Sequence, residues 1–423
     1  MKIVFMGTPE FAAASLKALV ESGQYEIAAV VTQPDRPKGR GHKVMMSAVK
    51  EYALTRDLPV LQPERVKTPE FQAEMEKIRP DRIGVAAFGQ FLPKVLLDLP
   101  QYGCINVHAS LLPRYRGAAP IHYAILKGEK EAGVTIMQMD VGMDTGAMLS
   151  KVAVPVGPEM TQGELHDILK EKGARLLLDT IPQLAAGTLQ PVPQPEEEAT
   201  YASLITRDME KADWTKTAEA LHNQFRAFDP WPGSFTLLPD GKRLKLWKSR
   251  IFTPEGNQGA PGTVLQADGK GFRVACGQGT LEILECQPEG KKRMPAASFV
   301  NGGPCETGRQ TGIDYEHGIS AEETAFHGTG LSGGAAGGGS GLWAMAAAGA
   351  GTGADPSLAA PGGGLDRPGG DPGSFFRSGG HRPGHFGLSH HPVLLFLGLA
   401  HHQPALSSGP VPGETYGDFQ TAG

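Results

Sequence analysis

Strand-like and helix-like segments alternate along the first half of this chain, and the alternation restricts the folds it can adopt. Short apolar runs, typical of buried strands, are followed by amphipathic stretches with apolar residues at helical spacing. The predicted strands are Lys2–Met6, Ile27–Thr32, Arg82–Ala87, Cys104–His108 and Gly133–Asp140, and the predicted helices are Phe11–Glu21, Met46–Arg56, Pro69–Lys77 and Ala119–Lys127. This order predicts an α/β domain with a mostly parallel sheet and helices on both faces. Ligands of such sheets bind outside the carboxyl ends of the strands.

The pattern changes after a proline-rich stretch, Gln190–Glu198, which has no hydrophobic period and is typical of a semi-rigid linker. Beyond it, a predicted helix at Thr217–Arg226 precedes short segments that alternate at strand spacing. These segments are Phe235–Leu238, Leu244–Lys248, Gly262–Leu265, Phe272–Cys276 and Leu281–Glu285. Five short strands predict a small β-barrel of the kind that binds extended nucleic acid, although other β-barrels would give the same pattern. We therefore expect one domain at residues 1–188, a linker at 189–205 and a second domain at 206–312.

The composition of the last part of the chain differs from the rest. Of the 57 glycines, 27 fall within residues 316–423, together with eight of the 13 histidines, three arginines and no lysine. Glycine-rich runs offer little apolar surface to bury and much backbone entropy to lose. We interpret residues 313–423 as a disordered, low-complexity tail. Translation of GC-rich DNA in a shifted frame would give this composition, and so would a genuine flexible tail.

Charge and cysteine content exclude several classes of function. The chain has 40 Lys and Arg against 45 Asp and Glu, so bulk positive charge does not bind it to nucleic acid. Its longest apolar run, residues 392–400, is well short of the ~20 residues of a membrane helix, and its start lacks the layout of a signal peptide. The four cysteines form no CxxC pair. We therefore expect a cytoplasmic monomer with no metal site, no disulfide framework and no membrane contact.

The densest chemical signal is the segment Cys104–Pro113. Asn106 and His108 are two positions apart on a predicted strand, so their side chains project from the same face. Burying such a polar pair costs free energy unless both groups are hydrogen-bonded, and a satisfied core pair is the simplest explanation of this motif alone. Further along, glycines at 142 and 146 flank Asp144 in a turn that would present the carboxylate to a ligand. Taken alone, an aspartate between glycines is more often a turn cap.

Together with other motifs, these residues closely resemble the 10-formyltetrahydrofolate-dependent formyltransferases, and within them the methionyl-tRNA formyltransferase family. The Asn-x-His motif and the distal aspartate are shared across the superfamily. The RAFDPWPG stretch and the C-terminal strands are typical of fewer members and point to the tRNA enzymes or their nearest relatives. The resemblance covers about residues 1–312 in order. It is carried by Phe5–Phe11, Thr32–Pro37, Asn106–Ile121, Met143–Gly146, Asp213–Trp214, Arg226–Gly233 and Glu289–Met294.

The resemblance implies a fold and a set of site residues. The fold is a Rossmann-like formyltransferase domain followed by an OB-like β-barrel domain, although Gly7-Thr8-Pro9 is not a dinucleotide-binding GxGxxG. The implied catalytic residues are Asn106, His108 and Asp144. The implied folate-binding residues are Ser110, Leu111, Leu112 and Pro113, with Phe88, Gly89 and Gln90 forming a slot for the pterin or, equally well, only a strand end and helix start. The implied tRNA-binding residues are Arg36, Lys38, Arg40 and Lys43, where the alternative is a solvated charged face.

These residue types suit formyl transfer, in which a neutral amine attacks a formamide-like carbonyl. The amide of Asn106 can donate to the tetrahedral oxyanion. A protonated His108 adds a charge-assisted hydrogen bond and can pass a proton to the leaving nitrogen. The carboxylate of Asp144 would hold the imidazole, stabilise its cation and help relay the proton that the amine loses. No metal is needed for this chemistry.

We expect the chain to transfer a formyl group from 10-formyltetrahydrofolate, its co-substrate, to the α-amino group of methionyl initiator tRNA, giving N-formylmethionyl-tRNA for translation initiation. One alternative is a formyltransferase acting on a small-molecule or sugar-nucleotide amine, and the C-terminal domain and the basic loop count against it. The other is a catalytically silent tRNA-binding protein, which would need none of Asn106, His108 and Asp144.

Overall fold

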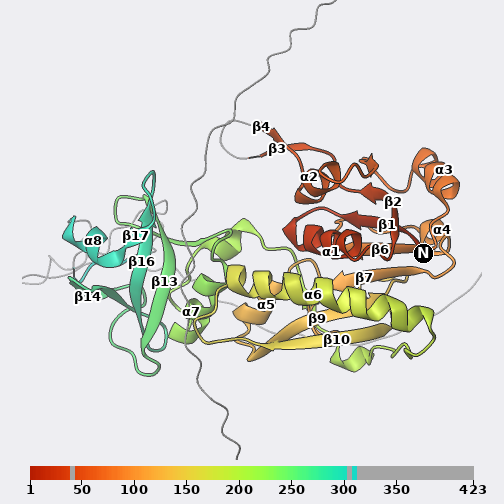
Figure 1. The fold of residues 1–423 in the computed structure, drawn as a ribbon. Helices are drawn as coiled ribbons and strands as arrows, with labels where there is room; N and C mark the ends of the chain where they lie inside the picture. Colours follow the sequence, from red (N-terminus) through yellow and green to blue (C-terminus); the bar gives the residue numbers. More distant parts are fainter. Residues whose placement is uncertain (39–42, 303–306, 312–423) are drawn as a thin grey trace, which may run out of the picture. The chain divides into compact units, whose positions relative to one another are not determined.

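The computed structural model describes residues 1–38, 43–302 and 307–311, which all belong to one compact unit (Figure 1). The tail predicted at residues 313–423 lies outside the described residues, and so does Arg40. No helix in the described ranges is long and apolar enough to cross a membrane.

The N-terminal domain is built on a seven-stranded sheet in the order β10-β9-β7-β6-β1-β2-β5. Its strands are β1 (Lys2–Gly7), β2 (Glu26–Val31), β5 (Val60–Leu61), β6 (Arg82–Ala86), β7 (Cys104–His108), β9 (Glu131–Gln138) and β10 (Met148–Pro155). The five strands from β7 to β5 are parallel to one another. β9 pairs antiparallel with β7, and β10 pairs antiparallel with β9. The prediction of a mostly parallel sheet is therefore confirmed.

Helices cover both faces of this sheet. They are α1 (Glu10–Glu21), α2 (Ala48–Leu54), α3 (Pro69–Ile78), α4 (Lys94–Leu97), α5 (Pro120–Leu126) and α6 (Gln162–Ala185). Along β1, Ile3 and Phe5 pack into a core with α1, α2, α5 and α6, whereas Val4 and Met6 pack into a core with α3 and α4. Figure 1 shows α1 and the long helix α6 across one face. Alternate side chains of the buried strands thus meet helices on opposite sides, as the apolar runs predict.

The C-terminal domain consists mainly of antiparallel strands in the order β12-β13-β16-β15-β14, with β17 paired to β16. Its elements are α7 (Ala218–Ala227), β12 (Ser234–Leu237), β13 (Arg243–Thr253), β14 (Val264–Asp268), β15 (Gly271–Ala275), β16 (Thr280–Pro288), β17 (Met294–Pro295) and α8 (Ala296–Asn301). All five predicted strands are present, and their inward side chains pack with α7 and α8 around Trp214 and Phe272. The predicted second domain of antiparallel strands is confirmed.

Between the two domains, the chain runs back along the N-terminal domain. Val192 forms a β-bridge with Met148 at the start of β10. A 3₁₀ turn at Glu196–Glu198 follows, and β11 (Tyr201–Ala202) then pairs in parallel with β8 (Arg116–Gly117). The proline-rich segment is therefore fixed to the N-terminal domain along much of its length.

Candidate active site

The last residues of β7 supply the first two polar groups of the site. Asn106 pairs with Val85 of β6 and Met137 of β9, and His108 pairs with Thr135 of β9. The intervening Val107 packs into the core beneath α1 and α6, so Asn106 and His108 project from the opposite face. Both side chains lie at the carboxyl end of a parallel strand, where sheets of this class bind ligands.

His108 is held by contacts on both ring nitrogens. Its side chain is 5% exposed, and Nε2 lies 2.9 Å from the carbonyl oxygen of Tyr115. A carbonyl oxygen only accepts hydrogen bonds, so Nε2 carries a proton. The other nitrogen, Nδ1, lies 3.6 Å from Oδ2 of Asp144. When Nδ1 is also protonated, the imidazolium and this carboxylate form an ion pair.

Asp144 reaches His108 from the loop between β9 and β10. Its backbone has φ of 55°, a left-handed conformation that aspartate adopts more readily than most residues. Oδ2 accepts a hydrogen bond from the backbone N–H of Gly117 at 2.8 Å. Asp140 organises the same loop, because its Oδ1 accepts from the Gly142 N–H and the Thr145 hydroxyl. One carboxylate of the loop therefore closes the turn, while the other faces the imidazole.

Asn106 completes the trio of predicted catalytic residues. Its side chain is half-buried, and among the described residues it has no hydrogen-bond partner. An amide group beside the His108–Asp144 pair is thus available to donate to a ligand oxygen. The structure brings the three side chains to one end of β7, and among the described residues no group of histidine, cysteine and acidic side chains is arranged to hold a metal ion.

The first predicted folate-binding segment, Ser110–Pro113, follows β7 directly. The Thr135 hydroxyl of β9 fixes it, donating to the carbonyl of Ser110 at 2.7 Å and accepting from the N–H of Leu112 at 3.1 Å. The Leu112 side chain is 1% exposed and packs against Met137 and Met148. This side chain therefore supports the site from within the core.

The second predicted folate-binding segment, Phe88–Gln90, follows β6, the neighbour of β7 in the sheet. The Phe88 side chain is buried in the core beneath α3 and α4, and its carbonyl accepts from the Gln33 amide at 3.1 Å. Gly89 is exposed, with φ of 86°. The Gln90 amide oxygen accepts from the N–H of Val66 at 3.1 Å, which ties this segment to the loop before α3. The structure thus places both predicted folate segments at adjacent strand ends.

Three of the four predicted tRNA-binding residues, Arg36, Lys38 and Lys43, lie on two short antiparallel strands after β2, called the hairpin below. Its strands are β3 (Arg36–Lys38) and β4 (Lys43–Met45), and the Arg36 side chain is exposed, with its guanidinium 3.9 Å from Glu64. At the base of the hairpin, Lys50 and then Gln62 hydrogen-bond to Asp35 and hold the pKa of its carboxyl below the usual value. The hairpin is therefore anchored at the carboxyl end of β2.

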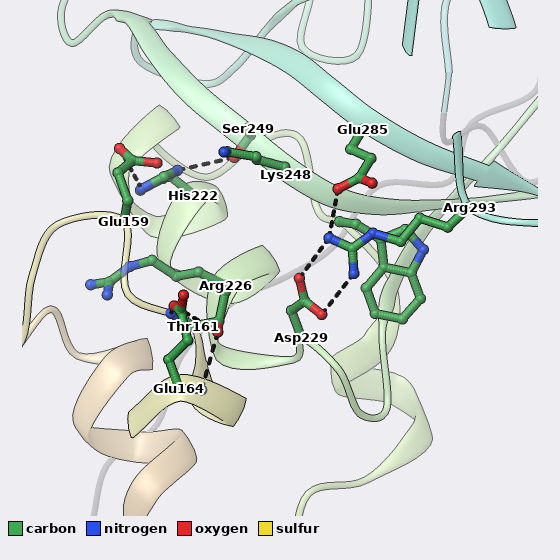
Figure 2. A pocket seen from close by; sticks show the side chains of 11 residues that line it. Glu159, Thr161, Glu164, His222, Arg226, Asp229, Lys248, Ser249, Glu285 and Arg293 are labelled. Carbon is green, nitrogen blue, oxygen red and sulfur yellow. Dashed lines mark hydrogen bonds and ion pairs between the residues drawn. The ribbon is translucent and has the colours of Figure 1, made fainter. Parts of the chain in front are cut away.

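A separate pocket of about 390 Å³ lies between the loop before α6 and the C-terminal domain (Figure 2). Arg226 donates to the carbonyls of Gly157 and Met160, at 3.3 and 3.0 Å. Arg293 pairs with Asp229 and Glu285, as Figure 2 shows. The residues that line this pocket come from the segment around the start of α6 and from the C-terminal domain, so it lies between the domains and is not part of the site at β7. The Arg226–Gly233 motif thus includes residues that connect the two domains.

Three residues that hold the site were not predicted as site residues from the sequence. Tyr115 and Gly117 act through backbone groups, which any residue possesses. Gln194, from the proline-rich segment, donates its amide N–H groups to the carbonyls of Asp144 and Gly146, at 2.8 and 2.7 Å. Tyr115 and Gly117 fall within the Asn106–Ile121 motif named above, whereas Gln194 falls within none of the motifs.

Both domains match models of known families. Residues 1–181 match the family described as formyl transferase, and residues 204–304 match the formyl transferase C-terminal domain. The chain is 50% identical over 317 residues to the methionyl-tRNA formyltransferase of Bacillus subtilis, covering 74% of this chain and 99% of that protein. It is 48% identical over 302 residues to that of Acetivibrio thermocellus, covering 71% of this chain and 96% of the relative. The chain belongs to the methionyl-tRNA formyltransferase family.

Membership of the methionyl-tRNA formyltransferase family confirms the resemblance seen in the motifs and the prediction of a formyl-transferring enzyme. Among solved structures, the chain is similar to the sugar 3N-formyltransferase WlaRD, crystallised with dTDP and 5-N-formyl-THF, at 20% identity and a TM-score of 0.49. That match covers 69% of this chain and 99% of WlaRD. The family assignment rests on the sequence matches, which are far closer.

Proposed function

We propose that this protein transfers the formyl group of 10-formyltetrahydrofolate to the α-amino group of methionyl initiator tRNA, as its family name indicates, and so supplies N-formylmethionyl-tRNA for translation initiation. The observation that carries the proposal is the trio at the end of β7. The Asn106 amide, without a hydrogen-bond partner among the described residues, lies beside His108, whose Nδ1 is 3.6 Å from Asp144. Relatives that are about 50% identical over nearly their whole length are named methionyl-tRNA formyltransferases.

The proposed reaction divides into two steps. In the first, the amine nitrogen bonds to the formyl carbon, and the carbonyl π electrons move to oxygen. In the second, the oxyanion re-forms the carbonyl as the bond between that carbon and the folate N10 breaks, and the electron pair of the broken bond goes to N10. The proton lost by the amine is finally taken up by the leaving nitrogen, so no oxidant or reductant is consumed.

Each member of the trio has a distinct part in these steps. The Asn106 amide donates to the oxygen as it becomes an oxyanion, which lowers the barrier most where the donor is already in place. His108, with its Nε2 proton held by the Tyr115 carbonyl, is fixed in orientation and exchanges a proton through Nδ1. Asp144 faces Nδ1 and stabilises the imidazolium.

The remaining parts of the proposal concern binding. Ser110, Leu111, Leu112 and Pro113, with Phe88, Gly89 and Gln90, hold the folate at the ends of β6 and β7. Arg36, Lys38, Arg40 and Lys43 engage tRNA phosphates through charge. We place the catalytic domain at 1–188, the linker at 189–205 and the tRNA-binding domain at 206–312, in a monomer that works in the cytoplasm.

A formylation assay with 10-formyltetrahydrofolate tests the function. Methionylated initiator tRNA, methionylated elongator tRNA and small amines, including an amino-sugar nucleotide, are compared for the wild type and His108→Ala. We expect transfer to initiator tRNA alone, reduced by roughly 10²- to 10⁴-fold in the variant. Transfer to the sugar nucleotide in place of tRNA would contradict the substrate, and tRNA binding without any transfer would contradict the enzyme.

A further inference from the structure

The side chain of Gln194 is connected to both structures that hold Asp144. Its Nε2 donates to the carbonyl oxygens of Asp144 and Gly146, at 2.8 and 2.7 Å, across the turn that carries the carboxylate. Its Oε1 accepts from Nε of Arg116 at 2.9 Å. Arg116 directly precedes Gly117, whose N–H donates to the Asp144 carboxylate. One amide from the proline-rich segment therefore links the backbone of Asp144 to the strand that receives its side chain.

Arg116, the partner of the Gln194 oxygen, is a buried side chain with a second partner from the same segment. Its Nη1 donates to both carboxylate oxygens of Glu196 at 3.0 and 2.9 Å, although the Glu196 side chain is largely exposed. Gln194 and Glu196 thus approach the guanidinium from the same short stretch of chain, while Nη2 is buried without a hydrogen-bond partner among the described residues. Burial and these two partners restrict the orientation of the planar guanidinium, so Arg116 anchors the Gln194 oxygen.

The residues that follow in the chain hold β8 itself and the adjacent Tyr115, which contacts the other ring nitrogen of His108. β11 pairs with β8, and the N–H of Arg116 donates to the carbonyl of Thr200 at 2.8 Å. The Thr200 hydroxyl accepts from the N–H of Tyr115 at 2.9 Å, and the Tyr115 carbonyl accepts the hydrogen bond from Nε2 of His108. The approach is so close that a Cβ at Gly117 would lie 2.8 Å from the carbonyl oxygen of Ala202. The segment thus contacts the supports of both His108 and Asp144.

We propose that Gln194 is a positioning residue for formyl transfer, holding the Asp144 turn so that its carboxylate faces Nδ1 of His108; this rests on the function proposed above. An amide is the one side-chain group of this size that supplies two donors and an acceptor together. Glutamate at the same position would place a carboxylate against two carbonyl oxygens, with no proton to share. Methionine would fill similar space but leave both carbonyls without their donor.

The test compares Gln194→Glu and Gln194→Met with Gln190→Glu in steady-state formylation of methionyl initiator tRNA. Gln190 is exposed in the same segment and has no hydrogen bond among the described residues. Because misplacement of a reacting group by about 1 Å costs up to roughly 100-fold, we expect kcat to fall roughly 10- to 100-fold in both Gln194 variants. KM for the tRNA should change less than about threefold, and Gln190→Glu should match the wild type.

A double-substitution experiment separates positioning from general damage. In single-turnover assays, Gln194→Met combined with Asp144→Asn should be no slower than Asp144→Asn alone, because Gln194 acts through the Asp144 carboxylate. Multiplied losses, or a wild-type kcat in Gln194→Met, would overturn the inference. If the wild type itself does not formylate methionyl-tRNA, the proposed function fails first, and the two failures are therefore distinct.

Discussion

The two sides of the His108–Asp144 pair are held in place by different means. His108 is on β7, which is hydrogen-bonded to β6 and β9 and packed on both faces. Asp144 is on a loop with a left-handed backbone, held by one peptide N–H and by the amide of Gln194. The imidazole is placed by the sheet as a whole, whereas the carboxylate depends on a few contacts that single substitutions remove.

The two catalytic side chains of this pair differ in how many contacts hold their backbone. A central strand is held by many neighbours, so no one contact decides where its side chains lie. A loop residue is fixed only as well as its own hydrogen bonds are satisfied. For Asp144, one of those bonds comes from Gly117 and the other from a segment about 50 residues further along the chain. We therefore expect loss of the contacts that hold Asp144 to affect catalysis more than stability.

The largest effect should come from the carboxylate itself. Asp144→Asn keeps an oxygen to accept from Gly117 but loses the charge that faces His108, so kcat should fall roughly 10²- to 10⁴-fold. Asp140→Asn is the matched control, because an amide oxygen there can still accept from Gly142 and Thr145. Steady-state kinetics measure both. Equal losses in the two variants would mean that loop charge, and not the contact with His108, matters.

The next largest loss of activity should come from a change on β7. Asn106→Ala removes the donor proposed for the oxyanion, which should cost about 2.7–4 kcal/mol of transition-state stabilisation, or roughly 10²- to 10³-fold in kcat. Because the side chain is half-buried and unpartnered among the described residues, the melting temperature should hardly change. Asn106→Asp, of the same shape but without donors, should lose as much. Full activity in Asn106→Asp would remove Asn106 from the oxyanion role.

The placement of Asn106 and His108 on β7 could be predicted from sequence, and the placement of Asp144 in its loop only in part. β6 is apolar after Arg82, and in β7 the two-residue spacing of Asn106 and His108 among apolar residues already places them on one face. The motif also pointed to Asp144. The contacts of Gln194 could not be predicted, because they depend on a return of the chain across the domain, and a glutamine between prolines has the composition of a spacer. The role of the Tyr115 carbonyl likewise has no counterpart in side-chain identity.

The longest helix, α6, was missed for a different reason. Its buried residues include Leu165, Leu169, Gly173, Leu177 and Ile181, which are spaced four apart, and Pro182 lies near its end. Glycine and proline both disfavour a helix interior, so the segment does not look helical by composition. A signal was nevertheless present: Thr161 and Glu164 form a capping box, with each side chain bonding the other's backbone N–H. The helix start was therefore predictable from sequence, and its length was not.

A smaller effect should follow from crowding the Asp144 turn. A Cβ at Gly146 would lie 1.8 Å from the carbonyl oxygen of Gln138, so Gly146→Ala must displace the loop. We expect kcat to fall about tenfold and the free energy of unfolding to fall by about 1–3 kcal/mol. Gly269→Ala, where a Cβ meets nothing within 4 Å, is the control and should change unfolding by less than about 0.5 kcal/mol. Denaturant unfolding and kinetics measure the two quantities. A stability loss with unchanged kcat would show that the turn tolerates displacement.

The smallest effect tests how rigid the strand side is. Cys104 begins β7 and is 1% exposed, and burial raises the pKa of its thiol to about 12. The thiol therefore stays protonated and unreactive from pH 7 to 9, where an exposed cysteine is increasingly a thiolate. We expect alkylation of Cys104, followed by peptide mass spectrometry, to be negligible in the folded protein at pH 9 and rapid in denaturant. Modification of Cys104 before global unfolding would mean that β7 opens locally, and that the strand and the loop differ less in rigidity than their contacts indicate.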